Sequence, residues 1–132
     1  MIQVAVGIII RKEISTSVLL CRRKESARYG LKWEFPGGKV EKDETTEECL
    51  LRELTEELSI TAVIGSLYHQ QQYLYPDSGT FDVFYYMIRQ FSGSIVNRVF
   101  ESFEWVSTAK LLEYDILEGN RDVVKKLMHE FR

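Results

Sequence analysis

The sequence predicts an α/β layered domain with a mixed sheet, because strand-like and helix-like segments alternate along the chain. Segments rich in Val, Ile, Leu and aromatic residues stand before, between and after two segments with helical periodicity. The first helical segment opens with a capping-box pattern, Thr45 followed by Glu48. Each helix must bury its apolar face against the strands, which predicts a layered core.

The order of the elements follows from these patterns. Strands are expected at residues 2–11, 17–22, 33–35, 61–68, 69–75, 80–90 and 103–106. Helices are expected at residues 45–58 and 121–131, with a helical turn at residues 108–112. Residues 24–32 are polar and indicate a loop. The run Pro36-Gly37-Gly38 is expected to halt the third strand, since two glycines permit backbone conformations closed to other residues.

Length and composition exclude several classes of protein. The 132 residues fit one domain over residues 1–132, and the formal net charge of −3 argues against a protein that coats nucleic acid. No stretch approaches the roughly 20 apolar residues of a membrane span. The apolar run at residues 4–10 has no basic region ahead of it, which indicates a buried strand and not a signal peptide. Cys21 and Cys49 are expected to be reduced core thiols of a cytoplasmic protein.

Three glutamates on the first helix form the strongest candidate site. At about 100° per residue, Glu53, Glu56 and Glu57 fall within an arc of about 100°, beside an apolar arc that docks the helix on the sheet. Carboxylates so close together repel one another, and a bound divalent cation removes that cost. Mg²⁺ and Mn²⁺ prefer such oxygen ligands, often together with substrate phosphates. Taken alone, the same pattern also fits a solvated helix face.

The surrounding segment resembles the Nudix box, the signature of the Nudix hydrolases. The matching positions are Gly38, five residues, Glu44, seven residues and then Arg52-Glu53-Leu54-x-Glu56-Glu57-x-Ser59-Ile60. One position departs, because the family has glycine where this chain has Ser59. A glycine at a helix end commonly adopts the left-handed conformation, and serine in that conformation costs ~1 kcal/mol. The departure is expected to change local stability and not the chemistry.

The resemblance implies a fold, a metal site and a reaction. The fold would be the Nudix fold, an α/β/α sandwich with a mixed curved sheet. Mg²⁺, with Mn²⁺ as a possible substitute, would be bound by Glu53, Glu56, Glu57 and the carbonyl of Gly38. Arg52 would hold a catalytic carboxylate in place through charge-assisted hydrogen bonds. The reaction would cleave a phosphoanhydride bond of a nucleotide.

The family also implies a glutamate outside the box, as metal ligand or general base. Glu104, which precedes Trp105, is the first choice and Glu101 is the competing one. Glu53 is the candidate base inside the box. Glu44 would support the junction between the loop and the helix; pairing with the helix dipole and a direct metal role are alternatives.

Further motifs resemble the MutT-like branch of the family, whose members hydrolyse nucleoside triphosphates to the monophosphate and pyrophosphate. Oxidised guanine nucleotides are its best-known substrate, which would give a role in cleansing the nucleotide pool and so in DNA repair. The resemblance implies contacts with the nucleotide by a basic pair, a lysine of the box, a turn and an asparagine. These substrate-binding candidates are Arg22, Arg23, Lys39, Tyr75, Asp77 and Asn120.

Each of these candidates has a simpler interpretation. The arginines and Lys39 could be surface charges, and Tyr75 could serve packing. Asn120 stands where it would either read a base or cap the last helix. Ser78 stands where the bacterial oxidised-guanine hydrolase has an arginine near the base, which weakens the guanine assignment.

Three other functions remain open. The first is hydrolysis of CTP or dCTP, and the second is hydrolysis of a dinucleoside polyphosphate or ADP-ribose. The third is a non-catalytic Nudix module that senses a nucleotide, although Arg52 and the three glutamates are all retained here. In each case the partner is a small-molecule nucleotide, with no nucleic acid and no membrane, and the chain is expected to be a monomer or a homodimer.

Overall fold

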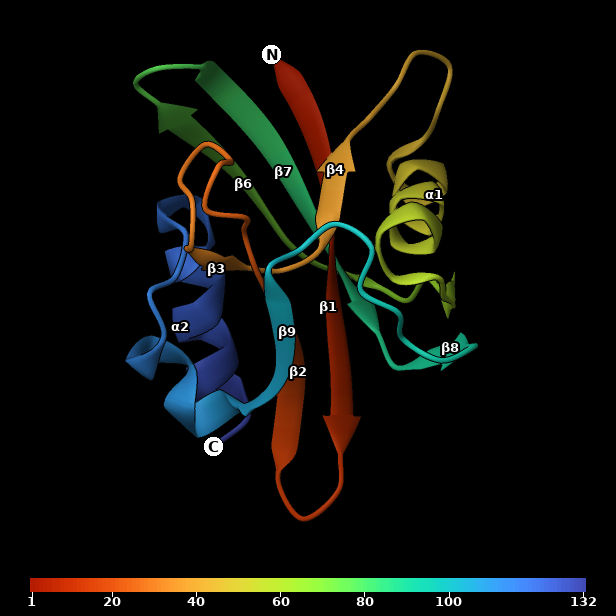
Figure 1. Ribbon diagram of the computed structural model, residues 1–132, viewed down its shortest axis with the longest axis vertical. Helices are drawn as coiled ribbons and strands as arrows, with labels where there is room; N and C mark the ends of the chain where they lie inside the picture. The colour runs from red at the N-terminus through yellow and green to blue at the C-terminus, as the bar shows by residue number, and fades with distance from the viewer.

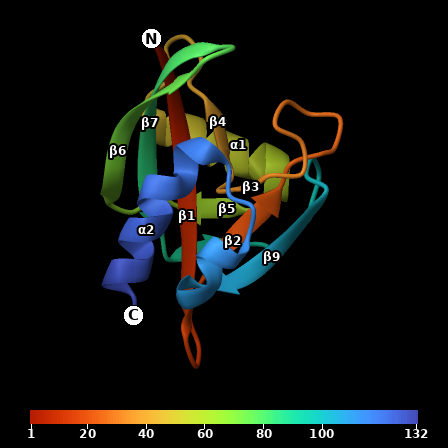
Figure 2. The same ribbon diagram turned by 90° about the vertical axis from the view of Figure 1, so that its left-hand side faces the viewer.

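A mixed β-sheet lies between two helices in the computed structural model, which describes residues 1–132 (Figures 1 and 2). Helix α1 covers one face of the sheet and helix α2 covers the other. This α/β/α arrangement confirms the predicted fold class. The elements are β1 (Ile2–Lys12), β2 (Thr16–Arg22), β3 (Trp33–Glu34), β4 (Gly37–Lys39), α1 (Thr46–Leu58), β5 (Thr61–Val63), β6 (Leu67–Tyr75), β7 (Gly79–Ile88), β8 (Gln90–Ser92), β9 (Ser102–Ser107) and α2 (Arg121–Glu130).

Strand β1 is the centre of the sheet. It pairs in parallel with β7 over most of its length, from Ile2↔Phe81 to Ile9↔Ile88. On its other edge it pairs with β2 only near the hairpin, from Ile10↔Val18 to Lys12↔Thr16. Beyond this point β1 and β2 diverge, and the chain that follows β2 fills the space between them.

Strands β3 and β4 occupy this space. Strand β3 pairs with the end of β2, and β4 pairs antiparallel with the first half of β1. The amide of Gly7 donates to the carbonyl of Pro36 at 2.8 Å, which ties the connecting residues to β1. The prediction that Pro36-Gly37-Gly38 halts the third strand is confirmed, since β3 ends at Glu34, but the short strand β4 over Gly37–Lys39 was not predicted. Glycine is needed at Gly37 because an added Cβ would lie 2.1 Å from the carbonyl oxygen of Ala5.

Two apolar clusters fill the two sides of the sheet. Alternate residues of β1 point to opposite faces, as strand geometry requires. Ile8 and Ile10 join the cluster under α2, whereas Ile9 joins the cluster under α1. The apolar side of α1 is buried in the second cluster, so the opposite side of this helix is free to carry polar groups. The buried residues of α1 are Cys49, Leu50, Leu54 and Leu58.

The predicted capping box of α1 is confirmed. The Thr45 hydroxyl accepts from the amide of Glu48 at 3.0 Å, and the Glu48 carboxylate accepts from the amide of Thr45 at 2.9 Å. At the other end Ser59 has φ 58° and ψ 32°, the left-handed conformation expected there. The chain thus enters and leaves α1 with its terminal amides and carbonyls partly satisfied.

Two of the predicted strands are broken in the structure. Residues 61–68 divide into β5 and the start of β6, because Gly65 and Ser66 leave the strand to bond with Met87 of β7. Residues 80–90 break at Arg89, after which β8 pairs with β5 in a separate two-stranded sheet. Residues that favour strands stand on both sides of each break, which explains why the sequence predicted unbroken strands.

The predicted strand at residues 103–106 and the predicted helix at residues 121–131 are confirmed as β9 and α2, with ends that differ by one residue. The predicted helical turn is a 3₁₀ helix over Thr108–Glu113. A second 3₁₀ turn, Glu118–Asn120, leads directly into α2. Among the helices, neither α1 nor α2 is long and apolar enough to cross a membrane.

The two cysteines provide a test of the packing. Both are free and buried, and burial raises the pKa of the Cys49 thiol to about 12 and that of Cys21 further above its usual range. Only the thiolate reacts rapidly with disulfide reagents. The native protein is therefore expected to release almost no thionitrobenzoate from Ellman's reagent at pH 8, and two equivalents per chain after addition of guanidinium. Rapid release of one equivalent by the native protein would contradict this packing.

Candidate functional site

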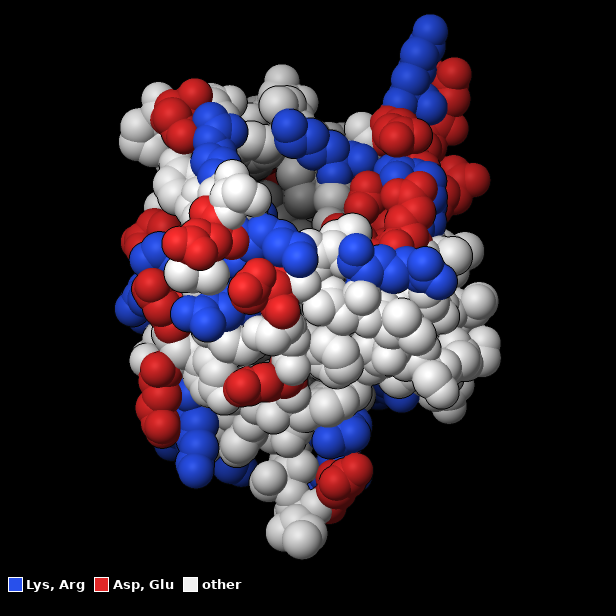
Figure 3. All heavy atoms as spheres, viewed as in Figure 1, with Lys and Arg blue, Asp and Glu red and all other residues white.

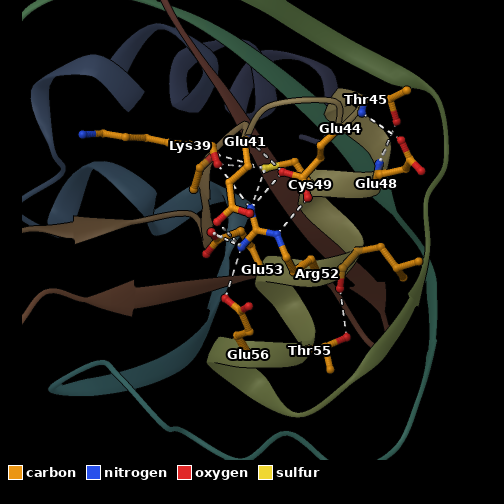
Figure 4. A network of polar contacts seen from close by, with 12 residues as sticks. Lys39, Glu41, Glu44, Thr45, Glu48, Cys49, Arg52, Glu53, Thr55 and Glu56 are labelled. Carbon is orange, nitrogen blue, oxygen red and sulfur yellow. Dashed lines mark hydrogen bonds and ion pairs between the residues drawn. The ribbon is translucent and has the colours of Figure 1, made fainter.

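Arg52 is the centre of the polar network on the exposed side of α1 (Figure 4). Its Nε and Nη2 donate to the two oxygens of Glu44 at 2.8 and 2.9 Å. Its Nη1 donates to Glu53 at 2.9 Å and to Glu56 at 3.2 Å. A further bond reaches the carbonyl of Lys39 at 3.3 Å. One guanidinium therefore connects the helix with the end of β4 and with the loop before the helix.

Glu44 serves this junction. Its bidentate pair with Arg52, together with a bond from the amide of Glu41 at 2.9 Å, lowers the pKa of Glu44 to about 2. Such fork-to-fork pairs are stronger and more directional than neutral hydrogen bonds. Glu44 is thus held as a carboxylate whose contacts are with the loop and with Arg52.

Glu53 lies directly against the backbone of β4. A Cβ added to Gly38 would lie 2.4–2.6 Å from the carboxyl atoms of Glu53, closer than any real Cβ contact. Only glycine therefore permits this carboxylate to reach its position. Burial raises the pKa of Glu53, and its bonds with Arg52 oppose that shift.

Glu57 is the most strongly perturbed carboxyl group of the site. One oxygen accepts from the amide of Gly37 at 3.2 Å. Burial first, and then the nearby charges of Glu53 and Glu34, raise the pKa of Glu57 to about 9. Like charges held together in a poorly solvated place favour protonation or a bound cation. This combination, in a cavity, is typical of functional sites.

The chemistry of these groups fits a hard divalent cation. The candidate ligands are carboxylates from Glu53, Glu56 and Glu57 with the Gly38 carbonyl, all of which are oxygen donors. In the arrangement described, no three His, Cys, Asp or Glu side chains lie close enough together to hold a metal ion. Arg52 engages Glu53 and Glu56, and the Gly37 amide engages Glu57. Binding of a cation would thus exchange some of these bonds for metal contacts.

A cavity of about 450 Å³ opens beside these carboxylates. Figure 3 shows the molecule hollowed near the top of the view, with a basic side chain reaching across the hollow and acidic side chains gathered over the start of α1. The volume is that of a small-molecule site, and apolar and polar groups are mixed on its surface. It is lined by residues of β1, β4, β7 and the loops around them, among them Val6, Arg23, Glu34, Phe35, Gly37, Gly38, Lys39, Glu57, Tyr75, Phe81, Phe100, Leu117 and Asn120.

Of the predicted basic pair, the structure places one member in the cavity. Arg23 lines it, and its Nη1 donates to both oxygens of Glu34 at 3.1 Å. Arg22 is not among the lining residues. Its Nε donates to the carbonyl of Leu31 at 3.1 Å, and its guanidinium lies 5.7 Å from the ring of Trp33. Glu34 offsets the charge of Arg23, and burial raises the pKa of that glutamate.

Lys39 and Tyr75 also line the cavity. The Lys39 ammonium lies 6.0 Å from the ring of Phe81, and no carboxylate pairs with it. The Tyr75 hydroxyl accepts from the amide of Gly119 at 3.0 Å, so this ring is held in place by the turn before α2. Lys39 is thus a cation available to an anionic group in the cavity.

Asp77 holds the rim of the cavity and is not among its lining residues. Its carboxylate pairs with the Arg28 guanidinium at 2.7 Å and accepts from the Tyr29 hydroxyl at 2.7 Å. The rings of Tyr29 and Tyr75 are 5.3 Å apart. These contacts join the loop after β2 to the turn between β6 and β7, and both Arg28 and Tyr29 line the cavity.

Asn120 lines the cavity and is 7% exposed. The interpretation of this side chain as a helix cap was wrong, because it makes no capping hydrogen bond. Its Oδ1 accepts from the amide of Phe35 at 3.2 Å, and its Nδ2 donates to the Tyr85 hydroxyl at 2.9 Å. A primary amide has two N–H donors and two acceptor lone pairs. One of each therefore remains for a ligand, on an amide whose orientation is fixed.

The structure does not bring Glu104 together with the other carboxylates. Glu104 pairs with Leu20 across β9 and β2, and Leu20 belongs to the cluster under α2. The neighbours of Glu104 in β9, Phe103 and Trp105, pack on the side of α1. Glu104 accepts from the Tyr114 hydroxyl at 2.5 Å. It therefore lies on the opposite face of the sheet from Glu53 and Glu57.

Glu101, the competing choice, is better placed. It directly follows Val99 and Phe100, which line the cavity, and its amide donates to the Arg22 carbonyl at 2.8 Å. The difference arises because Glu101 precedes β9, whereas Glu104 lies inside it, where pairing with β2 fixes the face of the sheet to which the side chain points. A Glu-Trp pair in a strand cannot reveal its face from sequence alone.

Sequence reasoning did not single out several residues of the cavity. Glu34 carried a signal, because a charged residue in a short apolar strand after a basic pair is unusual. Tyr85 carried a weaker one, as a polar-tipped aromatic on the buried side of β7, where its hydroxyl meets Asn120. No sequence signal indicated Arg28 or Tyr29, since their partner Asp77 is distant in sequence.

Comparison with known proteins shows the family of the chain. The model of the NUDIX domain matches residues 1–127. The 8-oxo-dGTP diphosphatase of Escherichia coli is 35% identical over 126 residues, which cover 96% of this chain and 95% of that protein. The CTP pyrophosphohydrolase of the same organism is 29% identical over 130 residues, which cover 97% of this chain and 92% of that protein.

Two solved structures are also similar to the chain. The E. coli ORF135 protein superposes with a TM-score of 0.85 at 29% identity, covering 98% of this chain and 89% of that one. A structure from a study of MutT from Aliivibrio salmonicida and Vibrio cholerae superposes with a TM-score of 0.77 at 32% identity, covering 98% of both chains.

The family model covers nearly the whole chain, and the relative from E. coli is 35% identical over almost its full length. The chain therefore belongs to the Nudix family of divalent-metal-dependent pyrophosphohydrolases.

Proposed function

We propose that the protein hydrolyses a nucleoside triphosphate to the monophosphate and pyrophosphate with Mg²⁺, and that oxidised dGTP is its preferred substrate. The observation that carries this proposal is one cavity lined by two chemically different groups of residues. Glu57 of α1 lines it together with Gly38 and Lys39, and this part is called here the carboxylate end. Asn120, which directly precedes α2 on the other face of the sheet, lines it beside Phe35, and this part is called the amide end. This polarity matches a molecule with a phosphate chain at one end and a base at the other.

The carboxylate end is suited to the phosphates. When bound there, Mg²⁺ would neutralise phosphate charge and lower the pKa of a water. Glu53, Glu56 and Glu57 would hold it, and Mn²⁺ offers the same coordination chemistry. Lys39 and Arg23 add positive charge along the cavity. Glu53 is our candidate for the general base, because Gly38 and Arg52 fix its carboxylate from two sides.

The amide end is suited to a purine. The free N–H and lone pair of Asn120 can meet one donor and one acceptor on a base edge, and Phe35 and Phe81 offer apolar contact. The relatives named 8-oxo-dGTP diphosphatase support the oxidised guanine nucleotide. Hydrolysis of such a nucleotide would remove it from the nucleotide pool in the cytoplasm and so reduce the need for DNA repair.

CTP is the second candidate substrate. It is supported by the similarity to the E. coli CTP pyrophosphohydrolase, and by Ser78, a small residue that lines the cavity where the resemblance implies an arginine. A smaller base would make fewer contacts with Phe35 and Phe81.

A hydrolysis panel separates these substrates. With Mg²⁺, kcat/KM for oxidised dGTP is expected to exceed that for dGTP and for CTP by at least about tenfold, the discrimination that one well-made pair of hydrogen bonds supplies. Released pyrophosphate would be measured, with ADP-ribose and a diadenosine polyphosphate as further members. A preference for CTP would assign the second candidate, and equal values for oxidised dGTP and dGTP would remove the proposed specificity. No turnover of any member would favour a nucleotide sensor.

The role of Glu53 can be tested with one substitution. Glu53→Gln keeps the size of the side chain and removes its negative charge, so kcat is expected to fall by at least about a hundredfold. The control is Glu47→Gln, a glutamate of the same helix that is exposed and makes none of the hydrogen bonds or ion pairs of Arg52. Wild-type turnover by Glu53→Gln would remove Glu53 from the site.

The close approach of β4 to Glu53 gives a second test. In Gly38→Ala the new methyl group must displace the Glu53 carboxylate, because the space available is 2.4 Å. A displacement of about 1 Å at a reacting group can cost about a hundredfold in rate. We expect kcat to fall by this order while the far-UV circular dichroism stays unchanged. An active Gly38→Ala variant would show that Glu53 does not act from this position.

A further inference from the structure

Ser59, the one departure from the family signature, has a partner of its own. It holds the left-handed conformation that a glycine would adopt without strain. Its side chain oxygen accepts a hydrogen bond from Nε of Arg98. A glycine at this position would lack the hydroxyl, so the contact depends on the departure.

Arg98 belongs to the segment between β8 and β9, residues 93–101, called here the 93–101 loop. The amide of Arg98 donates to the carbonyl of Glu57 at 3.0 Å, and the amide of Val96 donates to the carbonyl of Leu58 at 2.9 Å. These carbonyls are among the last four of α1, which have no partner inside the helix. Helix α1 has no basic residue in its last turn, and Arg98 places a positive charge at this negative end.

The same loop forms part of the cavity. Val99 and Phe100 line it, and Phe100 is 7% exposed. The Asn97 side chain bonds with both the amide and the carbonyl of Phe100 at 2.8 Å. The amide of Glu101 donates to the carbonyl of Arg22 at 2.8 Å. The loop therefore runs from the end of α1 to the cavity. Hydrogen bonds of backbone groups hold it at Arg98, at Phe100 and at Glu101.

We propose that Ser59 and Arg98 are positioning residues for the nucleotide, because their contact fixes the 93–101 loop against the cavity. The proposal rests on the proposed function, since it assumes that the nucleotide occupies this cavity. Glu57 connects the two regions: its carbonyl holds the loop and its side chain lines the cavity. Neither Ser59 nor Arg98 lines the cavity, so both act through Val99 and Phe100.

Kinetics of a small set of variants tests this proposal. Ser59→Ala and Arg98→Ala are each expected to raise KM for the best triphosphate by about tenfold, the effect of losing one hydrogen bond to a charged group, with kcat unchanged. The double variant is expected to match either single variant, because both remove the same contact. Arg89→Ala is the control, since Arg89 is exposed and does not line the cavity. Wild-type KM in both single variants, or fully additive effects in the double variant, would overturn the proposal.

Ser59→Gly separates positioning from simple stabilisation. Glycine relieves the left-handed backbone and also removes the hydroxyl, so its thermal midpoint is expected to equal or exceed that of Ser59→Ala. KM is nevertheless expected to rise as it does in Ser59→Ala. If KM in Ser59→Gly were that of the wild type, the hydroxyl would have no positioning role.

Hydrogen exchange keeps this inference distinct from the proposed function. The amides of Phe100 and Glu101 are both hydrogen-bonded and report on the loop without any substrate. Faster exchange of these amides in Ser59→Ala and Arg98→Ala, and not in Arg89→Ala, is the expected result. Should the wild type turn over no nucleotide, the proposed function would fail while this measurement still decided whether the contact positions the loop. Unchanged exchange in both variants would overturn the positioning role.

Discussion

The arrangement of the site depends on the Arg52 guanidinium, which is bonded at once to the helix, to the loop before it and to the end of β4. A guanidinium carries five N–H donors in a fixed plane, so its partners must take fixed positions around it. Glu44 takes two of these donors and Glu53 a third. A lysine could supply the charge without this geometry, because its ammonium does not present two parallel donors to one carboxylate.

The divergence of β1 from β2 leaves room for β4, and Arg52 bonds with the end of that strand. Backbone amides reach the helix there only because Gly37 and Gly38 lack side chains. The two glycines thus act by permitting close approach in a strand, one toward Ala5 and the other toward Glu53. Pairing of β4 with β1 then gives the glycines a rigid frame, which a mobile turn would not supply.

The sequence predicted the layered fold, the capped helix and the carboxylate face, because each of these depends on patterns among residues that are close together in the sequence. Breaks in strands were not predictable in this way. The break between β5 and β6, for example, depends on a hydrogen bond from Gly65 to Met87, which is distant in the sequence. The face of Glu104 also depended on pairing of β9 with β2, which the sequence does not state. Asn120 was ambiguous for a related reason: its partners Phe35 and Tyr85 come from two other elements.

An acidic protein that binds a polyanion has to place its few cations with care. In the cavity Arg23 is offset by Glu34, and Arg28 at the rim is offset by Asp77, so Lys24 and Lys39 are the lining cations without a carboxylate partner. Two ammonium groups cannot balance a triphosphate, and Glu53 adds negative charge close to the cavity. The remaining balance would come from a bound cation, which would at the same time stabilise the charged form of Glu57, whose pKa is raised to about 9 by burial first and by the charges of Glu53 and Glu34 next. Substrate and metal would therefore each make the binding of the other more favourable, a coupling that is reciprocal by thermodynamic necessity.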